Sequence, residues 1–70
     1  KLSEAKVDFS GIVKEVLDCE FEQKLYEFGI VPGATVYVIK AAPFKGPLYV
    51  KVEDSLLAIR RSEAAFILVN

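Results

Sequence analysis

The feature that most constrains this chain is a change in apolar spacing after Gly33. Before it, Phe21, Leu25 and Phe28 recur at intervals of four and three, which is one face of a helix. After it, apolar and polar residues alternate with a period of two, as in strands that are covered on one face. With only 70 residues, the chain is expected to form a single domain over 1–70, mainly β with one inserted helix.

The same spacings predict each element. A helix over Glu20–Phe28 ends at Gly29, which supplies the left-handed residue that commonly closes a helix. A strand over 11–17 precedes it and contains one irregularity, because its alternation slips once. The other predicted elements are a helical turn held by Leu2, strands over 35–40, 48–53, 56–60 and 66–69, a loop over 43–47, and a helical turn over 62–64.

A tight turn at Asp54-Ser55 would place Glu53 opposite Leu56, giving the hairpin one apolar and one wet face. The predicted core combines the apolar face with the helix: Leu48, Val50, Val52, Leu57, Ile59, Phe21, Leu25 and Phe28. The wet face carries Tyr49, Lys51, Glu53, Leu56, Ala58 and Arg60. Five short strands and one helix bury their apolar faces only if the sheet curls on itself, so we expect a small barrel of about five strands.

The composition excludes several classes of function. The chain has no histidine and a single cysteine, which rules out an internal disulfide, a Cys/His zinc cluster and a Cys–His or Ser–His catalytic pair. Its net charge of −1 argues against nucleic acid as a partner. It has no phosphate-binding P-loop motif, and no apolar run long enough to insert in a membrane. We therefore predict no catalytic residue and no cofactor.

The segment from Asp18 to Glu22 is the only metal-like grouping, because it mixes the Cys19 thiol with three carboxylates. Iron(II) accepts such ligands, but its sites usually include imidazole, and this spacing spreads the side chains around a helix start. We interpret the charges as stabilising the helix N-terminus and Cys19 as a small core residue, and we predict no metal ligand. A metal-carrying role is the competing hypothesis, which calorimetry with anaerobic iron(II) would test.

An apolar surplus indicates a partner surface, because hydrophobic residues make up 53% of a chain with little interior. Phe44 lies at a loop tip, where it either meets a partner or folds back over the barrel end. Tyr49 should flank Arg60 on the wet face, where the two either stack or recognise a partner carboxylate. One arginine of Arg60-Arg61 is expected to pair with an acidic group of the domain. The predicted partner-binding residues are Tyr26, Phe44, Tyr49, Leu56 and Arg60.

The order of short motifs along nearly the whole chain resembles the FeoA family. The motifs are Leu2-Ser3-Glu4, Gly11-Ile12-Val13, Lys24-Leu25, Phe28-Gly29-Ile30-Val31-Pro32-Gly33, Val36-Tyr37-Val38, Ala42-Pro43, Gly46-Pro47 and Leu57-Ala58-Ile59-Arg60-Arg61-Ser62-Glu63-Ala64. That family consists of small cytoplasmic proteins of the bacterial ferrous iron transport system. The resemblance implies an SH3-like barrel without catalysis. It also implies docking on the cytoplasmic GTPase region of the ferrous iron permease, at the inner face of the cell membrane.

Two other settings stay open for such a domain. Related domains occur fused to the permease, and a chain that begins at Lys1 suits a piece of a longer protein. Others form the C-terminal SH3-like accessory domain of metal-dependent transcriptional repressors, which is the alternative function. Self-association into homo-oligomers through barrel edges is a further expectation, because an incompletely closed barrel leaves strand edges free. Asp54 stands where the family often has glycine, which bears on the tightness of the predicted turn.

Overall fold

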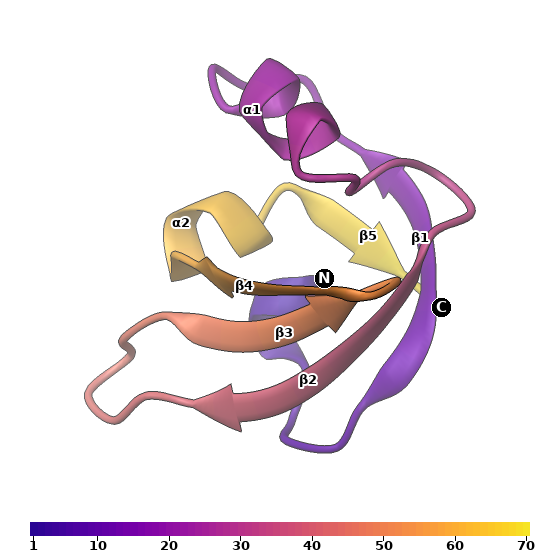
Figure 1. Cartoon of the computed structure of the whole chain (residues 1–70). Helices are drawn as coiled ribbons and strands as arrows, with labels where there is room; N and C mark the ends of the chain where they lie inside the picture. Colours follow the sequence, from indigo (N-terminus) through magenta and orange to yellow (C-terminus); the bar gives the residue numbers. More distant parts are fainter.

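The computed structural model describes residues 1–70, and five antiparallel strands wrap around a common interior (Figure 1). The elements in chain order are η1 (Leu2–Glu4, a 3-10 turn), β1 (Ser10–Val16), α1 (Glu22–Glu27), β2 (Thr35–Ala41), β3 (Leu48–Val52), β4 (Ser55–Ile59), α2 (Arg61–Ala64) and β5 (Ile67–Val69). The strand order is β4-β3-β2-β1-β5. This confirms the predicted mainly β architecture.

β1 pairs with two different strands along its length. Its first half pairs with β2 and its second half with β5. The pairing register shifts between Val13 and Glu15, which confirms the predicted irregularity. At Gly11, an added Cβ would stand 2.2 Å from the backbone oxygen of Asn70. The absence of a side chain at Gly11 therefore allows the end of the chain to lie against β1.

α1 is shorter than the predicted helix. It covers Glu22–Glu27 rather than Glu20–Phe28, because the residues before it form turns. Phe28 lies past the helix end and is 39% exposed, so its assignment to the core was wrong. Its ring instead lies beneath the ammonium of Lys24, 5.8 Å from Nζ to the ring centroid. Gly29, with φ of 89°, follows the helix as predicted.

The β3–β4 hairpin turns one residue earlier than predicted. Val52 pairs with Ser55, so the two loop residues are Glu53 and Asp54. Glu53 adopts the left-handed backbone of the tight turn, with φ of 54°. Leu56 consequently pairs with Lys51 instead of residue 53, a displacement of two along β3. Because side chains alternate with a period of two, every residue of the hairpin stays on its predicted face.

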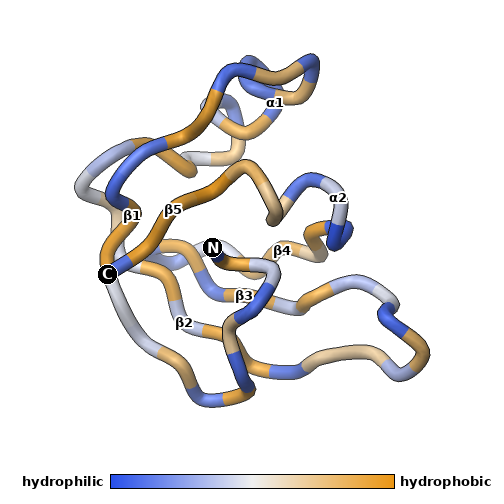
Figure 2. Tube along the Cα trace, turned by 180° about the vertical axis from the view of Figure 1, so that it is seen from behind, coloured by the Kyte–Doolittle hydropathy of each residue, from blue (hydrophilic) through white to orange (hydrophobic).

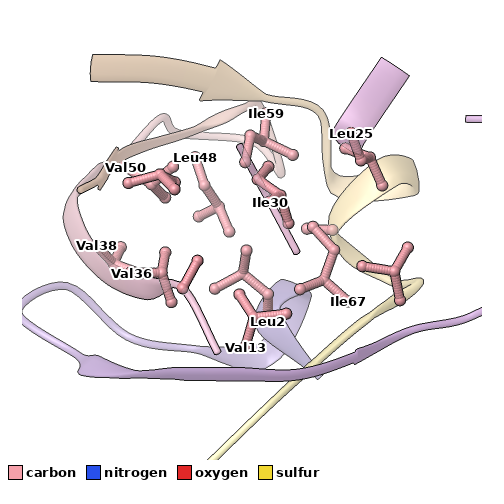
Figure 3. Close-up of a cluster of buried hydrophobic side chains, with 14 residues drawn as sticks. Leu2, Val13, Leu25, Ile30, Val36, Val38, Leu48, Val50, Ile59 and Ile67 are labelled. Atoms are coloured by element: carbon pink, nitrogen blue, oxygen red, sulfur yellow. The ribbon is translucent and has the colours of Figure 1, made fainter. Parts of the chain in front are cut away.

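The core is one cluster of 14 buried side chains, contributed by strands, helices and η1 (Figure 3). Of the predicted core, five residues are buried, namely Leu25, Leu48, Val50, Val52 and Ile59. Phe21 and Leu57 are partly buried against the cluster. Leu2 is 1% exposed, so η1 is held by that residue as predicted. The interior also takes Ile30 and Ile67, which lie outside the hairpin and the helix from which the core was predicted.

Candidate protein-interaction surface

An apolar groove lies on the outer face of β2, β3 and β4, and we call it the outer groove. It has a volume of about 330 Å³. Its lining residues are Ile39, Lys40, Tyr49, Val50, Leu56, Leu57 and Ala58. Six of these seven are hydrophobic, so the groove suits apolar side chains of a partner. Figure 2 shows how hydrophobic and hydrophilic residues follow one another along these strands.

Local irregularities of the strands produce this groove. In β2 the register against β3 shifts between Val38 and Lys40, and both Ile39 and Lys40 are exposed there. Tyr49 pairs with Ala58, a residue with a small side chain, and is 41% exposed. Leu56, in β4, is 72% exposed. The exposed apolar lining residues therefore form a contiguous patch instead of scattered surface residues, and they are Ile39, Tyr49, Leu56 and Ala58.

The structure brings Tyr49 and Leu56 together in the outer groove but leaves Arg60 outside it. In the observed register Tyr49 lies opposite Ala58, so the prediction that Tyr49 flanks Arg60 was wrong. Arg60 instead precedes α2, and its backbone N–H donates to Glu63 Oε1 over 3.1 Å. The exposed groove residues that the prediction missed are Ile39, Lys40 and Ala58. The slip in β2 that exposes Lys40 beside Ile39 carries no separate sequence signal.

Phe44 is fully exposed, so the alternative in which it covers the barrel end was wrong. The Gly46 N–H donates to the Pro43 carbonyl oxygen over 3.1 Å and closes a four-residue turn. Its two central residues, Phe44 and Lys45, have φ of 59° and 58°. Left-handed backbone is unfavourable for residues with a Cβ, and exceptional for a bulky one. The loop thus presents an aromatic ring to solvent in a strained conformation, which favours a functional role.

Arg61 fixes this loop to the rest of the barrel. Its Nε donates to the Gly46 carbonyl oxygen over 3.1 Å and its Nη1 to the Ser3 carbonyl oxygen over 3.2 Å. The guanidinium therefore binds backbone oxygens of the β2–β3 loop and of η1. The expectation that Arg60 or Arg61 pairs with an acidic side chain was wrong, since the ion pairs are Lys24 with Glu63 and the N-terminus with Glu4.

Two further tyrosines lie outside the outer groove. Tyr26 is 42% exposed on α1, and its hydroxyl lies 3.5 Å from Glu22 Oε2. Partial desolvation and the Glu22 carboxylate raise the pKa of Tyr26. The Tyr37 hydroxyl donates to Asp8 Oδ1 over 2.6 Å, and this hydrogen bond raises the pKa of Tyr37. Tyr26 is thus a separate exposed aromatic, whereas Tyr37 is engaged with the turn before β1.

The acidic segment 18–22 does not converge into a ligand set. No group of three or more histidine, cysteine, aspartate or glutamate side chains in the chain is arranged to hold a metal ion. Cys19 is half-buried and makes no disulfide. A larger and shallower hollow lies along the N-terminal residues, with a volume of about 550 Å³, but its lining mixes both charges with apolar residues. No helix of the chain is both long and apolar enough to cross a membrane.

The curled five-stranded sheet and its exposed apolar groove define a small SH3-like domain. The fold matches Stenotrophomonas maltophilia FeoA, a prokaryotic SH3 domain protein whose structure was solved in complex with zinc. The TM-score is 0.86 at 32% identity, over 99% of this chain and 87% of that one. A family model described as the FeoA domain matches residues 1–70, and the chain belongs to the FeoA family. This confirms the resemblance found in the sequence and, with it, the SH3-like barrel.

A curated relative and a regulator give the wider context. The chain is 37% identical over 50 residues to a fusion of Fe(2+) transport protein A with the Fe(2+) transporter FeoB from Porphyromonas gingivalis. That match covers 71% of this chain and 6% of the fusion protein. A manganese-dependent transcriptional repressor matches at TM-score 0.89, over 97% of this chain and 39% of that one, but at 18% identity. The second likeness is one of fold alone and gives the alternative function no further support.

Proposed function

We propose that residues 1–70 act as one non-enzymatic protein-interaction domain of ferrous iron uptake, which docks on the cytoplasmic GTPase region of the ferrous iron permease. The observation that carries this proposal is the Porphyromonas gingivalis relative, in which a segment similar to this chain is joined to a Fe(2+) transporter. Covalent linkage keeps two modules at high effective concentration, which favours pairs that work in contact. The domain would then be cytoplasmic and reach the inner face of the membrane through its partner.

The surface that suits this role is the outer groove together with the neighbouring Phe44 loop. SH3-like barrels bind extended segments in grooves lined by aromatic residues, and Tyr49 and Phe44 supply exposed rings. Binding would shift the permease between states that it already samples. We propose no nucleic-acid partner, in line with the net charge of −1, and no direct membrane insertion. Besides the permease, we propose a second copy of the chain as a partner, through an edge of the barrel.

Calorimetry with the purified cytoplasmic part of the permease from the same organism tests the docking. We expect Tyr49→Ala to weaken binding about tenfold or more, as for an aromatic at the centre of an interface. Tyr26→Ala is the matched comparison, because the two tyrosines are 41% and 42% exposed on different faces. Absence of binding by the unmodified chain contradicts the docking itself. Weakening by Tyr26→Ala and not by Tyr49→Ala would move the contact from the groove to α1.

A further inference from the structure

β4 is an edge strand with no hydrogen-bonded neighbour on its outer side. It pairs with β3 alone, and none of the backbone hydrogen bonds outside the helices and strands involves residues 55–59. Ser55, Leu56 and Ala58 are all exposed. The edge of such a strand carries N–H and C=O groups without partners and is a template for pairing with another strand.

The hairpin register identifies the free backbone groups. In an antiparallel pair, residues alternate between those whose N–H and C=O face the neighbouring strand and those whose groups face away from it. Val52 and Ser55 close the two-residue turn, so they face one another. Counting from that pair, Leu56 and Ala58 are the residues whose groups point away from β3. The outer edge of β4 thus offers two donors and two acceptors in a regular array.

β4 also lacks the features that protect strand edges. Its sequence, Ser-Leu-Leu-Ala-Ile, contains no charged residue and no proline, and its pairing with β3 has no bulge. The other edge strand, β5, is protected by its short length and by a packed neighbour. It has three residues, and η1 packs against it. Of the two edges of the sheet, β4 is therefore the one open to another strand.

The charges at the two ends of β4 have opposite signs and indicate which strand fits. Asp54 precedes the strand and Arg60 follows it, and both are exposed. If two copies of β4 run antiparallel with Leu57 opposite Leu57, Leu56 lies opposite Ala58 and Asp54 opposite Arg60, each twice by symmetry. All outward backbone groups then find partners. A shift of two residues either way places Asp54 against residue 58 or 62 and loses both charge pairs.

Resting on the self-association proposed above, we propose that a second copy of this chain pairs with β4 in this register, so that two sheets join across a two-fold axis. Leu56 of one copy would then lie beside Ala58 of the other, and the two outer grooves would adjoin. Each copy contributes a strand of five residues. Stable interfaces usually bury about 1,200–2,000 Å² in total, so a contact of this size gives a reversible dimer at high protein concentration.

Sedimentation equilibrium of the chain alone, from about 10 µM to about 1 mM, tests the dimer without the permease. The weight-average mass should rise toward that of two copies. Over the same concentrations, amide exchange at Leu56 and Ala58 should slow, because their N–H groups become hydrogen-bonded. A monomer at every concentration contradicts the proposal, as does protection that appears at residues 67–69 instead. Because no permease is present, these results do not depend on the docking proposed above.

Two charge reversals test the register. Arg60→Asp and Asp54→Arg each place like charges at both ends of the homodimer, and each should weaken association about tenfold or more. Mixing the two variants restores both complementary pairs, so the heterodimer should form about as well as the unmodified dimer. Lys6→Asp, a reversal at an exposed residue outside β4, should leave association unchanged. Far-UV circular dichroism establishes that each variant is folded, and folded variants that do not associate on mixing contradict the register.

Discussion

Glu63 is the one buried charged residue, at 2% exposed, and both of its carboxylate oxygens are bound. Lys24 Nζ donates to Oε2 over 2.7 Å, and the Arg60 N–H donates to Oε1 over 3.1 Å. The pair joins α1 to α2, although Lys24 and Glu63 are 39 residues apart in sequence. Buried carboxylates are tolerated when they are paired and hydrogen-bonded in this way.

The ionisation of Glu63 should make folding stability depend on pH. Burial alone would raise its pKa, but the hydrogen bonds from Lys24 and Arg60 and the attraction of Lys24 outweigh burial and hold the pKa below its usual 4.5. A carboxyl group whose pKa is lower in the folded state adds stability above its unfolded pKa. That contribution is lost as the pH falls from about 4.5 through the folded pKa.

Urea unfolding at a series of pH values between about 3 and 7 measures this effect. Lys24→Met removes the attraction that lowers the pKa of Glu63, so it should reduce the gain in stability between low and neutral pH. Lys51→Met is the comparison, because Lys51 is exposed and makes no ion pair. Equal pH dependence in both variants would contradict the role assigned to the Lys24–Glu63 pair.

The left-handed loop at Phe44 and Lys45 gives a second prediction for single residues. Lys45 has φ of 58°, a conformation that glycine adopts without strain. Lys45→Gly should therefore raise the free energy of unfolding by about 0.5–1 kcal/mol, measured by urea titration.

Phe44→Ala should leave the free energy of unfolding within about 0.5 kcal/mol of its original value, since the ring is fully exposed. A loss of more than about 1 kcal/mol in either variant would show that the loop is held by side-chain packing.

At the scale of elements, apolar spacing predicted where strands and helices lie better than where they end. The period of two placed Leu48, Val50 and Val52 on the buried face. The same pattern misplaced the turn by one residue, because Glu53 takes a backbone conformation that usually selects glycine or asparagine. The residues still lie on their predicted faces, because moving the turn by one residue shifts the pairing register by two.

Gly11 gives the prediction at this scale. A Cβ there would lie 2.2 Å from the Asn70 oxygen and 2.6 Å from a ring carbon of Phe9, so β1 and the chain end would have to separate. Gly11→Ala should cost about 1–3 kcal/mol in the free energy of unfolding and should speed amide exchange at Asn70. The Asn70 N–H donates to the Ile12 carbonyl oxygen over 3.0 Å and reports on this contact.

Gly33→Ala is the control for Gly11→Ala. Gly33 has φ of 97° and no atom within 4 Å of an added Cβ, so it separates backbone strain from crowding. Its substitution should lower stability without changing exchange at Asn70. If Gly11→Ala leaves both stability and that exchange rate unchanged, the close approach of the chain end is not a constraint on the fold.

At the scale of the whole molecule, one core carries the stability while the outer groove contributes little to it. Leu48 is fully buried and Leu56 is 72% exposed, within the same hairpin. Leu48→Ala should cost about 2–5 kcal/mol, a large part of the total for so small a domain. Leu56→Ala should change stability by about 0.5 kcal/mol or less. Comparable losses in the two variants, measured by thermal or urea unfolding, would mean that the groove belongs to the core.

Part of the candidate site was predictable from the alternation of apolar and polar residues along the strands. Tyr49 and Leu56 were identified because an apolar residue on a wet face stands out against its polar neighbours. Ile39 was missed although the alternation of β2 places it on the exposed face with Thr35 and Tyr37. The register slip against β3 exposes Lys40 beside it, and that slip is a property of two strands together. Arg60 was misplaced with the turn, and Tyr26 lies on α1, which is joined to α2 by the Lys24–Glu63 contact. Contacts between distant segments leave no periodic signal in one sequence.

The two hydrogen bonds of Arg61 have a mechanical consequence. One side chain on α2 holds both the β2–β3 loop at Gly46 and η1 at Ser3. A force applied at the Phe44 loop is therefore transmitted through the guanidinium to η1. Leu2, in that turn, is part of the buried core. A partner that pulls on the exposed loop thus loads η1 and the barrel interior as well as the two strands that the loop joins.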